Sequence, residues 1–171
     1  MVSTILRTAV LSTVLSVALM ACDSRGRAYE DWRLARLTEG QSNEDDVRKI
    51  FGDPAAVRAS AGGKSLIYPL GPEGPYTLAM KIDANGKYQG RENLLTRVHF
   101  DRVHRGMKEV DILGMFGRPG RAERYPLKQQ TAWEWRFLDG GETRVFVVTF
   151  DASGTVVNSA VEEDPRRFGG R

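Results

Sequence analysis

The chain has 171 residues, with 25 Lys plus Arg against 22 Asp plus Glu and a formal net charge of +3. The excess of positive charge is small, and the N-terminus resembles an export signal. Both observations argue against a nucleic-acid partner. The single cysteine excludes an intramolecular disulfide framework, and the length suits one ordinary domain or two small repeats.

The first 21 residues have the pattern of a secretory signal. Arg7 is their only charged side chain, and it precedes an uncharged run from Thr8 to Ala21. That run has about fourteen residues, fewer than the roughly 20 that a membrane-spanning helix requires, so a signal is favoured over a permanent span. We therefore predict a signal peptide over residues 1–21 and a tether over residues 22–29.

The end of this signal, Leu19-Met20-Ala21-Cys22, resembles the lipobox of bacterial lipoproteins, whose cysteine becomes the acylated first residue of the mature chain. The resemblance implies a periplasm-facing lipoprotein held by membrane lipid through Cys22, because several acyl chains together anchor stably. Asp23 resembles a sorting signal that keeps some lipoproteins in the inner membrane. The alternative is an ordinary secreted protein whose cysteine falls near the cleavage site by chance.

The tether is followed by signals for two helices. Residues 29–38 place Trp32, Leu34 and Leu37 on one side, which predicts a first helix. Ser42-Asn43-Glu44-Asp45 then resembles a capping box that puts Ser42 before a second, short helix. Gly52 and the proline two residues later are expected to end that helix.

Three strands are expected next, at residues 64–70, 76–82 and 94–100. A segment rich in glycine and proline joins the first two, and Asn85-Gly86 turns into a longer loop over residues 87–93. From alternation along the strands, we expect one face of the resulting sheet to be open to solvent or to a partner.

The second half of the sequence repeats these signals in the same order. Phe51-Gly52-x-Pro recurs 65 positions later at Phe116-Gly117, and Asp83-Ala-Asn-Gly recurs 68 positions later as Asp151-Ala-Ser-Gly. Strands are expected at 131–138, 142–150 and 155–161, and Asp-Gly-Gly between the first two favours a hairpin. The first helix has only a brief counterpart at residues 100–105.

These elements predict an α+β fold in which two tandem helix-helix-three-strand units form one antiparallel sheet of about six strands, with helices on one face. We place repeat 1 at residues 30–101 and repeat 2 at residues 102–164. Residues 165–171 are expected to form a disordered basic tail, which could contact anionic lipid.

The aromatic residues allow two interpretations. Trp133, Trp135 and Phe137 alternate along one strand and therefore face the same side. Packing against the short helices is favoured, and the alternative is an aromatic stripe that binds a partner on the open sheet face. Tyr68 and Tyr76 are the corresponding residues of the first half.

Catalytic or metal chemistry has weak support in the sequence. His99, Asp101 and His104 lie near the junction of the repeats, but they lack a recognised metal-ligand spacing, so we expect surface or linker histidines and no metal site. We expect no cofactor. A metal-dependent enzyme or metal sensor that uses these histidines remains an alternative.

The repeated pattern of glycine, short helix, Phe-Gly-x-Pro and Asp-x-x-Gly resembles the SmpA/OmlA (BamE-like) lipoprotein family, with Gly106-Met107, Ile112, Phe116-Gly117 and Pro119 as the closest match. In tandem, the unit resembles the β-lactamase inhibitor protein fold, which binds its enzyme with an exposed sheet face. The resemblance implies a non-enzymatic accessory or scaffold in cell-envelope protein assembly, with the β-barrel assembly machinery as a candidate partner and the outer membrane as its location. The alternative function is an inhibitor-like module that acts on an envelope or exogenous hydrolase.

Overall fold

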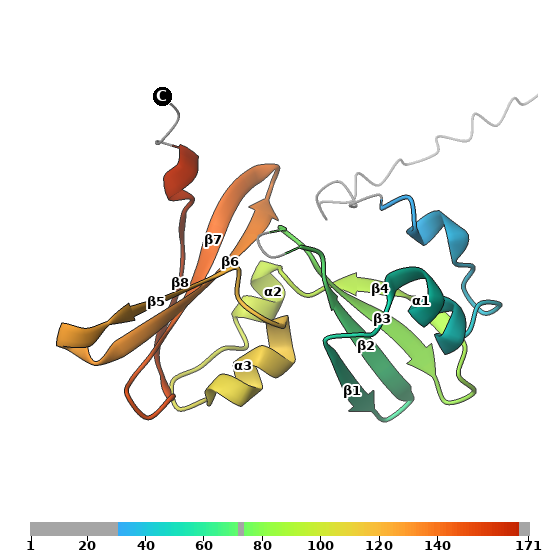
Figure 1. The fold of residues 1–171 in the computed structure, drawn as a ribbon, viewed down its shortest axis with the longest axis horizontal. Coiled ribbons are helices and arrows are strands. Elements are labelled where there is room, and N and C mark those ends of the chain that lie inside the picture. Colours follow the sequence, from blue (N-terminus) through green and yellow to red (C-terminus); the bar gives the residue numbers. More distant parts are fainter. Residues whose placement is uncertain (1–30, 72–73, 168–171) are drawn as a thin grey trace, which may run out of the picture.

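The fold was analysed in a computed structural model that describes residues 31–71 and 74–167. Over these residues the chain forms three α-helices and two four-stranded antiparallel sheets (Figure 1). The predicted α+β class is therefore confirmed.

The first sheet follows a 3₁₀ turn and a helix. The turn spans Leu34–Arg36 and helix α1 spans Glu44–Phe51. Asn43, and not Ser42, is the N-cap of α1: its side chain accepts a hydrogen bond from the Asp46 backbone N–H, and the Asp46 carboxylate accepts one from the Asn43 N–H. The strands then pair in chain order: β1 (Ala56–Ser60), β2 (Gly63–Pro69), β3 (Thr77–Asp83) and β4 (Tyr88–Asn93).

The second sheet follows two helices, α2 (Arg97–Phe100) and α3 (Glu109–Phe116). Its strands also pair in chain order: β5 (Arg121–Tyr125), β6 (Gln130–Asp139), β7 (Glu142–Phe150) and β8 (Val156–Glu163). Two 3₁₀ turns, Pro126–Lys128 and Pro165–Arg167, lie between β5 and β6 and after β8.

The two halves repeat the same backbone hydrogen bonds. Gly40 N–H donates to the Tyr88 carbonyl over 2.8 Å, and Gly106 N–H donates to the Val156 carbonyl over 3.0 Å. Likewise, the Asp83 carboxylate accepts from the Lys87 N–H, and the Asp151 carboxylate accepts from the Thr155 N–H. The repeating unit seen in the structure is thus a short helix with four strands.

Several expectations about the sheets are wrong. The single sheet of about six strands is instead two sheets, because strands β1 and β5, which the sequence analysis missed, complete two separate four-stranded meanders. Residues 88–93, expected in a loop, form β4, since the Asp83–Gly86 turn is tight and Tyr88 pairs directly with Ile82. Residues 97–100, expected in a strand, form α2.

The helix expected over residues 29–38 is also wrong, because among its described residues, 31–38, only the 3₁₀ turn forms. Leu34 is buried and Leu37 packs against the first core, but the Trp32 side chain is 72% exposed. One turn of helix cannot bring all three apolar side chains onto one surface.

Each sheet has its own hydrophobic core. The first core lies between α1 and one face of the first sheet and includes Val47, Leu66 and Met80. The second core is rich in aromatic rings and lies between α2, α3 and one face of the second sheet. Leu95, Phe100 and Val103 belong to the second core, so it begins before residue 102, where the sequence analysis placed the start of repeat 2.

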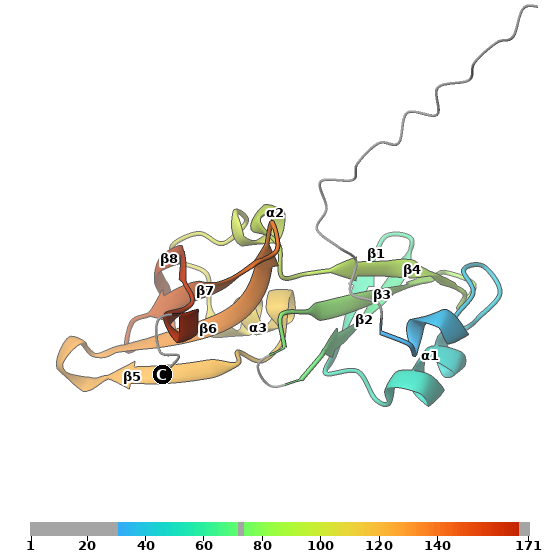
Figure 2. The same cartoon turned by 90° about the horizontal axis from the view of Figure 1, so that it is seen from above.

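The other face of the first sheet is covered by the second half of the chain. The Thr77 hydroxyl donates a buried hydrogen bond of 3.0 Å to the Phe116 carbonyl, and the Arg58 guanidinium donates to the Gly114 and Met115 carbonyls at the end of α3. Ile67 is fully buried on this face. Helices α2 and α3 thus lie between the two sheets (Figures 1 and 2).

Candidate functional site

The predicted lipidation and sorting residues, Cys22 and Asp23, lie outside the described residues. The same holds for most of the predicted tether and for the end of the basic tail. Within the described part of the chain, no helix is long and apolar enough to span a bilayer.

The aromatic stripe on β6 faces the second core. Trp133, Trp135 and Phe137 share one side of the strand, as predicted, and that side packs against Phe100 and Phe116 from α2 and α3. Trp135 and Phe137 are 2% and 1% exposed. The structure therefore corresponds to the core-packing interpretation for these two rings, and only Trp133 retains partial exposure.

The tyrosines predicted to match this stripe pack in the first core. Tyr68 is buried, and its hydroxyl donates a 2.9 Å hydrogen bond to the Gly52 carbonyl, which ties β2 to the end of α1. Burial raises the pKa of the Tyr68 phenol. Tyr76 is half-buried against the same core.

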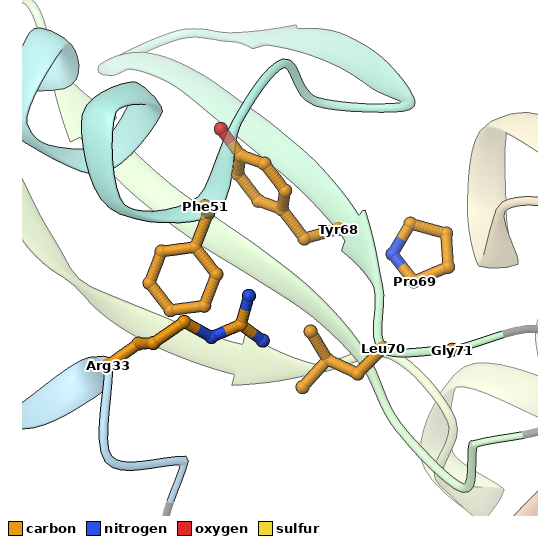
Figure 3. A pocket seen from close by; sticks show the side chains of 6 residues that line it. All are labelled: Arg33, Phe51, Tyr68, Pro69, Leu70 and Gly71. Carbon is orange, nitrogen blue, oxygen red and sulfur yellow. The ribbon is translucent and has the colours of Figure 1, made fainter.

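An open pocket of about 340 Å³ lies beside Tyr68 (Figure 3). The Arg33 guanidinium lies 4.5 Å from the centre of the Phe51 ring, and Leu70 faces the same space. Asp31 binds this guanidinium through both carboxylate oxygens at 2.9 and 3.0 Å from Nε, and these hydrogen bonds hold the pKa of Asp31 below its usual value. Because the guanidinium of Arg33 is already paired with Asp31, it is less available to bind an anion in the pocket.

A hydrogen-bonded array joins the two halves at His99. His99 Nε2 lies 3.1 Å from Glu92 of β4, and Nδ1 lies 2.8 Å from the Thr96 hydroxyl. Burial lowers the pKa of His99, although the charge of Glu92 acts in the opposite direction. Burial acts to raise the pKa of Glu92, but hydrogen bonding and charge from Lys81 outweigh it and the net shift is downward. The array fixes α2 against the first sheet.

The structure does not bring the three candidate metal ligands together. His99 contacts Glu92 and Thr96, whereas Nδ1 of His104 lies 3.1 Å from the Arg105 carbonyl. Among residues 31–71 and 74–167, no group of three or more His, Cys, Asp or Glu side chains is placed to hold a metal ion. His99 was expected to be a surface or linker histidine at the end of a strand, and this is wrong because the segment is helical and the residue is buried.

The face of the second sheet that points away from its core is here called the outer face. Cross-strand pairing aligns a row of Arg121, Glu134, Val147 and Ala160 on it. Glu134, Val147 and Ala160 are half-buried and Arg121 is exposed, so the centre of this face is accessible to a partner. It combines aliphatic side chains with paired charges, since Arg121 lies 3.9 Å from Glu134.

One end of the outer face is covered by the C-terminal turn. Asp164 is buried and pairs with Arg136 of β6, with an Nε–Oδ2 distance of 2.7 Å. Hydrogen bonding from Arg136 holds the pKa of Asp164 below its usual value. The Arg136–Asp164 pair therefore fixes the start of the predicted tail, residues 165–167, against the sheet.

The residues of the outer face were not among the predicted binding residues. The sequence did contain a pattern that indicates this face. Within residues 131–138, Glu134 and Arg136 alternate with the aromatic residues and therefore point to the opposite side of the strand. Strand β5 was missed because its sequence, Arg-Ala-Glu-Arg-Tyr, has the charged composition of an edge strand and no apolar alternation.

The fold and this site define an α+β protein with two similar four-stranded units, one of which leaves a sheet face open. No family model matches the sequence, and no curated protein matches it. Among solved structures, the chain is similar to a putative osmotically inducible lipoprotein, OsmE, with 24% identity over 41% of this chain and 68% of that one and a TM-score of 0.34. It is also similar to a DUF4309 family protein from Bacillus subtilis, with 14% identity over 75% of this chain and 82% of that one and a TM-score of 0.29. At these TM-scores neither similarity identifies a function for this chain.

Proposed function

We propose that this protein is a periplasm-facing lipoprotein, anchored in a membrane by acyl groups on Cys22. Its folded part acts as a non-enzymatic accessory or scaffold in cell-envelope protein assembly, and a partner protein binds the outer face of the second sheet. The lipobox-like sequence Leu19-Met20-Ala21-Cys22 supports the anchor. The repeated sequence pattern suggests that the two units arose by duplication. In this proposal the second unit binds the partner.

The main support for the binding role is that the two sheets differ in how many of their faces are covered. The first sheet is covered on both faces, by α1 on one side and by the end of α3 on the other. The second sheet is covered by helices on one face only, and Val147 and Ala160 remain accessible on the other. Aliphatic side chains within a charged rim match the usual composition of a protein–protein interface.

Metabolic labelling tests the anchor. Cells that express the full chain are grown with radiolabelled palmitate, and labelling of the protein should disappear in Cys22→Ser and persist in Ser24→Ala, a matched control two residues away. A wild-type protein without label would refute the lipoprotein assignment. Separation of inner and outer membranes, with Asp23→Ser beside the wild type, then identifies the membrane.

Site-specific crosslinking tests the binding face. A photo-crosslinking amino acid at Val147 should capture a partner in native membranes, whereas the same residue at Lys49, an exposed position on α1, should not. Recovery of barrel-assembly subunits at Val147 supports the assembly role. Recovery of a hydrolase, together with its inhibition by the purified protein, would favour the inhibitor-like alternative, and equal capture at both positions would refute the outer face as the site.

A further inference from the structure

The hairpin of β5 and β6 extends away from the second core at one end of the long axis (orange, at the left of Figures 1 and 2). All residues of β5 except Glu123 are exposed. At the tip of the hairpin, the Leu127 side chain is fully exposed, at 102% of its reference area, and Tyr125 is 40% exposed. Packing inside the protein therefore does not account for Leu127, and it leaves Tyr125 partly exposed.

The corresponding hairpin of the first sheet is built differently. Strands β1 and β2 are joined by only Ala61 and Gly62, whereas residues 126–129 join β5 to β6 through a 3₁₀ turn. Gln129 ends this turn with a φ of 51°, the one positive φ of a non-glycine residue in the described part of the chain. A backbone conformation that is unfavourable for glutamine gives the longer turn a defined shape with Leu127 at its apex.

The charges near this apex are mainly positive. Arg121 pairs with Glu123 at 2.7 Å, which leaves Arg124 and Lys128 as the cations on either side of Leu127. The turn itself, Pro-Leu-Lys-Gln, has no acidic residue. An apolar apex with a cationic rim is complementary to the surface of an anionic bilayer, where leucine enters the acyl boundary, tyrosine lies at the headgroups and Lys or Arg approach the phosphates.

We propose that the β5–β6 hairpin is a membrane-contact element that inserts Leu127 into the interface of a bilayer containing anionic phospholipid. Binding of the hairpin to a bilayer does not depend on the membrane anchor at Cys22. Only its physiological effect rests on that part of the proposed function. The start of the described chain and the hairpin tip lie in opposite halves of the long axis (Figures 1 and 2). An anchor and a hairpin contact together would hold the long axis along the membrane, because tethering makes even a weak second contact effective.

Vesicle binding of the unacylated protein tests the hairpin separately from the anchor. Residues 22–171 with Cys22→Ser are mixed with vesicles of phosphatidylethanolamine and phosphatidylglycerol, and with vesicles of phosphatidylcholine alone. We expect sedimentation with the anionic vesicles that Leu127→Ala weakens about tenfold. Val57→Ala, which truncates a 53%-exposed side chain on the equivalent strand β1, should have no effect.

The charge contribution is tested in the same assay. Arg124→Gln with Lys128→Gln should weaken binding to the anionic vesicles about tenfold or more at low salt, while Lys49→Gln on α1 should not. Circular dichroism of each variant verifies that it is folded, which is expected because all of these side chains are exposed.

A spectroscopic probe locates the apex directly. In the Cys22→Ser background the chain has no other thiol, so Leu127→Cys can carry a single environment-sensitive fluorophore. Its emission should shift to the blue with anionic vesicles, and the same label at Leu138→Cys, in the β6–β7 hairpin, should not shift. Three outcomes would overturn the proposal: no binding to vesicles, equal binding by all variants, or a Leu127-dependent contact with a protein but not with vesicles. Failure of palmitate labelling would leave this result unchanged and would refute only the anchor.

Discussion

Two equivalent glycines provide a measure of how firmly the two halves are joined. Gly52 and Gly117 end α1 and α3 with nearly the same backbone angles, φ 81° and ψ −163° for the first and φ 74° and ψ −165° for the second. This region of conformational space is essentially restricted to glycine, so alanine at either position costs roughly 1–3 kcal/mol of stability through backbone strain.

The two positions differ in their surroundings. A Cβ atom added to Gly52 would meet no atom within 4 Å, whereas one added to Gly117 would lie 2.9 Å from Cγ of Pro69 in the first sheet. Overpacking of this kind typically costs a further 1–3 kcal/mol. We therefore expect Gly52→Ala to lower the free energy of unfolding by about 2 kcal/mol and Gly117→Ala by about 3–5 kcal/mol.

Urea denaturation followed by tryptophan fluorescence measures both losses, provided that the two variants unfold in a single transition with an unchanged m-value. A double-mutant cycle with Pro69→Ala then isolates the contact, and Gly117→Ala should recover at least about 1 kcal/mol in that background. Equal losses for the two glycine variants, or a coupling energy of zero, would refute the close packing of β2 against the end of α3.

Three further predictions concern buried polar groups. Arg136→Met should destabilise the protein by about 3 kcal/mol in urea denaturation, because the buried Asp164 carboxylate loses its salt bridge to Arg136. Asp164→Asn in the same chain should restore part of the loss, and a change below about 0.5 kcal/mol would contradict this. Trp135→Phe should cost less than about 1 kcal/mol, since the indole Nε1 of Trp135 is buried without a hydrogen-bond partner in the described part of the chain and the substitution removes that penalty. A loss of about 3 kcal/mol or more would contradict this reasoning. His99 should make the free energy of unfolding fall as the pH decreases from about 7 to 5, because burial lowers the pKa of His99 in the folded protein and the unfolded chain therefore binds the proton first. His99→Gln should flatten this slope in pH-dependent denaturation, and an unchanged slope would exclude the effect.

The strongest strands were predictable from sequence because local chemistry determines them. Residues 142–150 form a strand with the predicted bounds, since β-branched and aromatic residues follow an Asp-Gly-Gly turn. The edge strands were not predictable in the same way. Strands β1 and β5 consist largely of Arg, Ala, Ser and Glu, and only pairing with the strand that follows stabilises them.

The candidate site shows the same limit. Alternation correctly placed Trp133, Trp135 and Phe137 on one side of β6, but a period of two does not show which side meets the helices. That choice depends on Phe100 and Phe116, which are distant in sequence and form the opposite wall of the core. The accessible face is therefore the one with Glu134 and Arg136, which sequence patterns alone present as an ordinary solvated surface.

The covering of the first sheet by α3 has a consequence for the order of folding. The chain emerges from its N-terminal end, whether from the ribosome or from an export channel, so residues 31–93 appear before α3. The first sheet can therefore form while its second face, with Ile67 and Ala79, is still exposed to water. The hydrogen bond from Thr77 to Phe116 closes this face across 39 residues of chain. Until then the nascent first unit presents an apolar surface that a chaperone can bind, and truncation before residue 109 should yield an aggregation-prone fragment rather than a stable small domain.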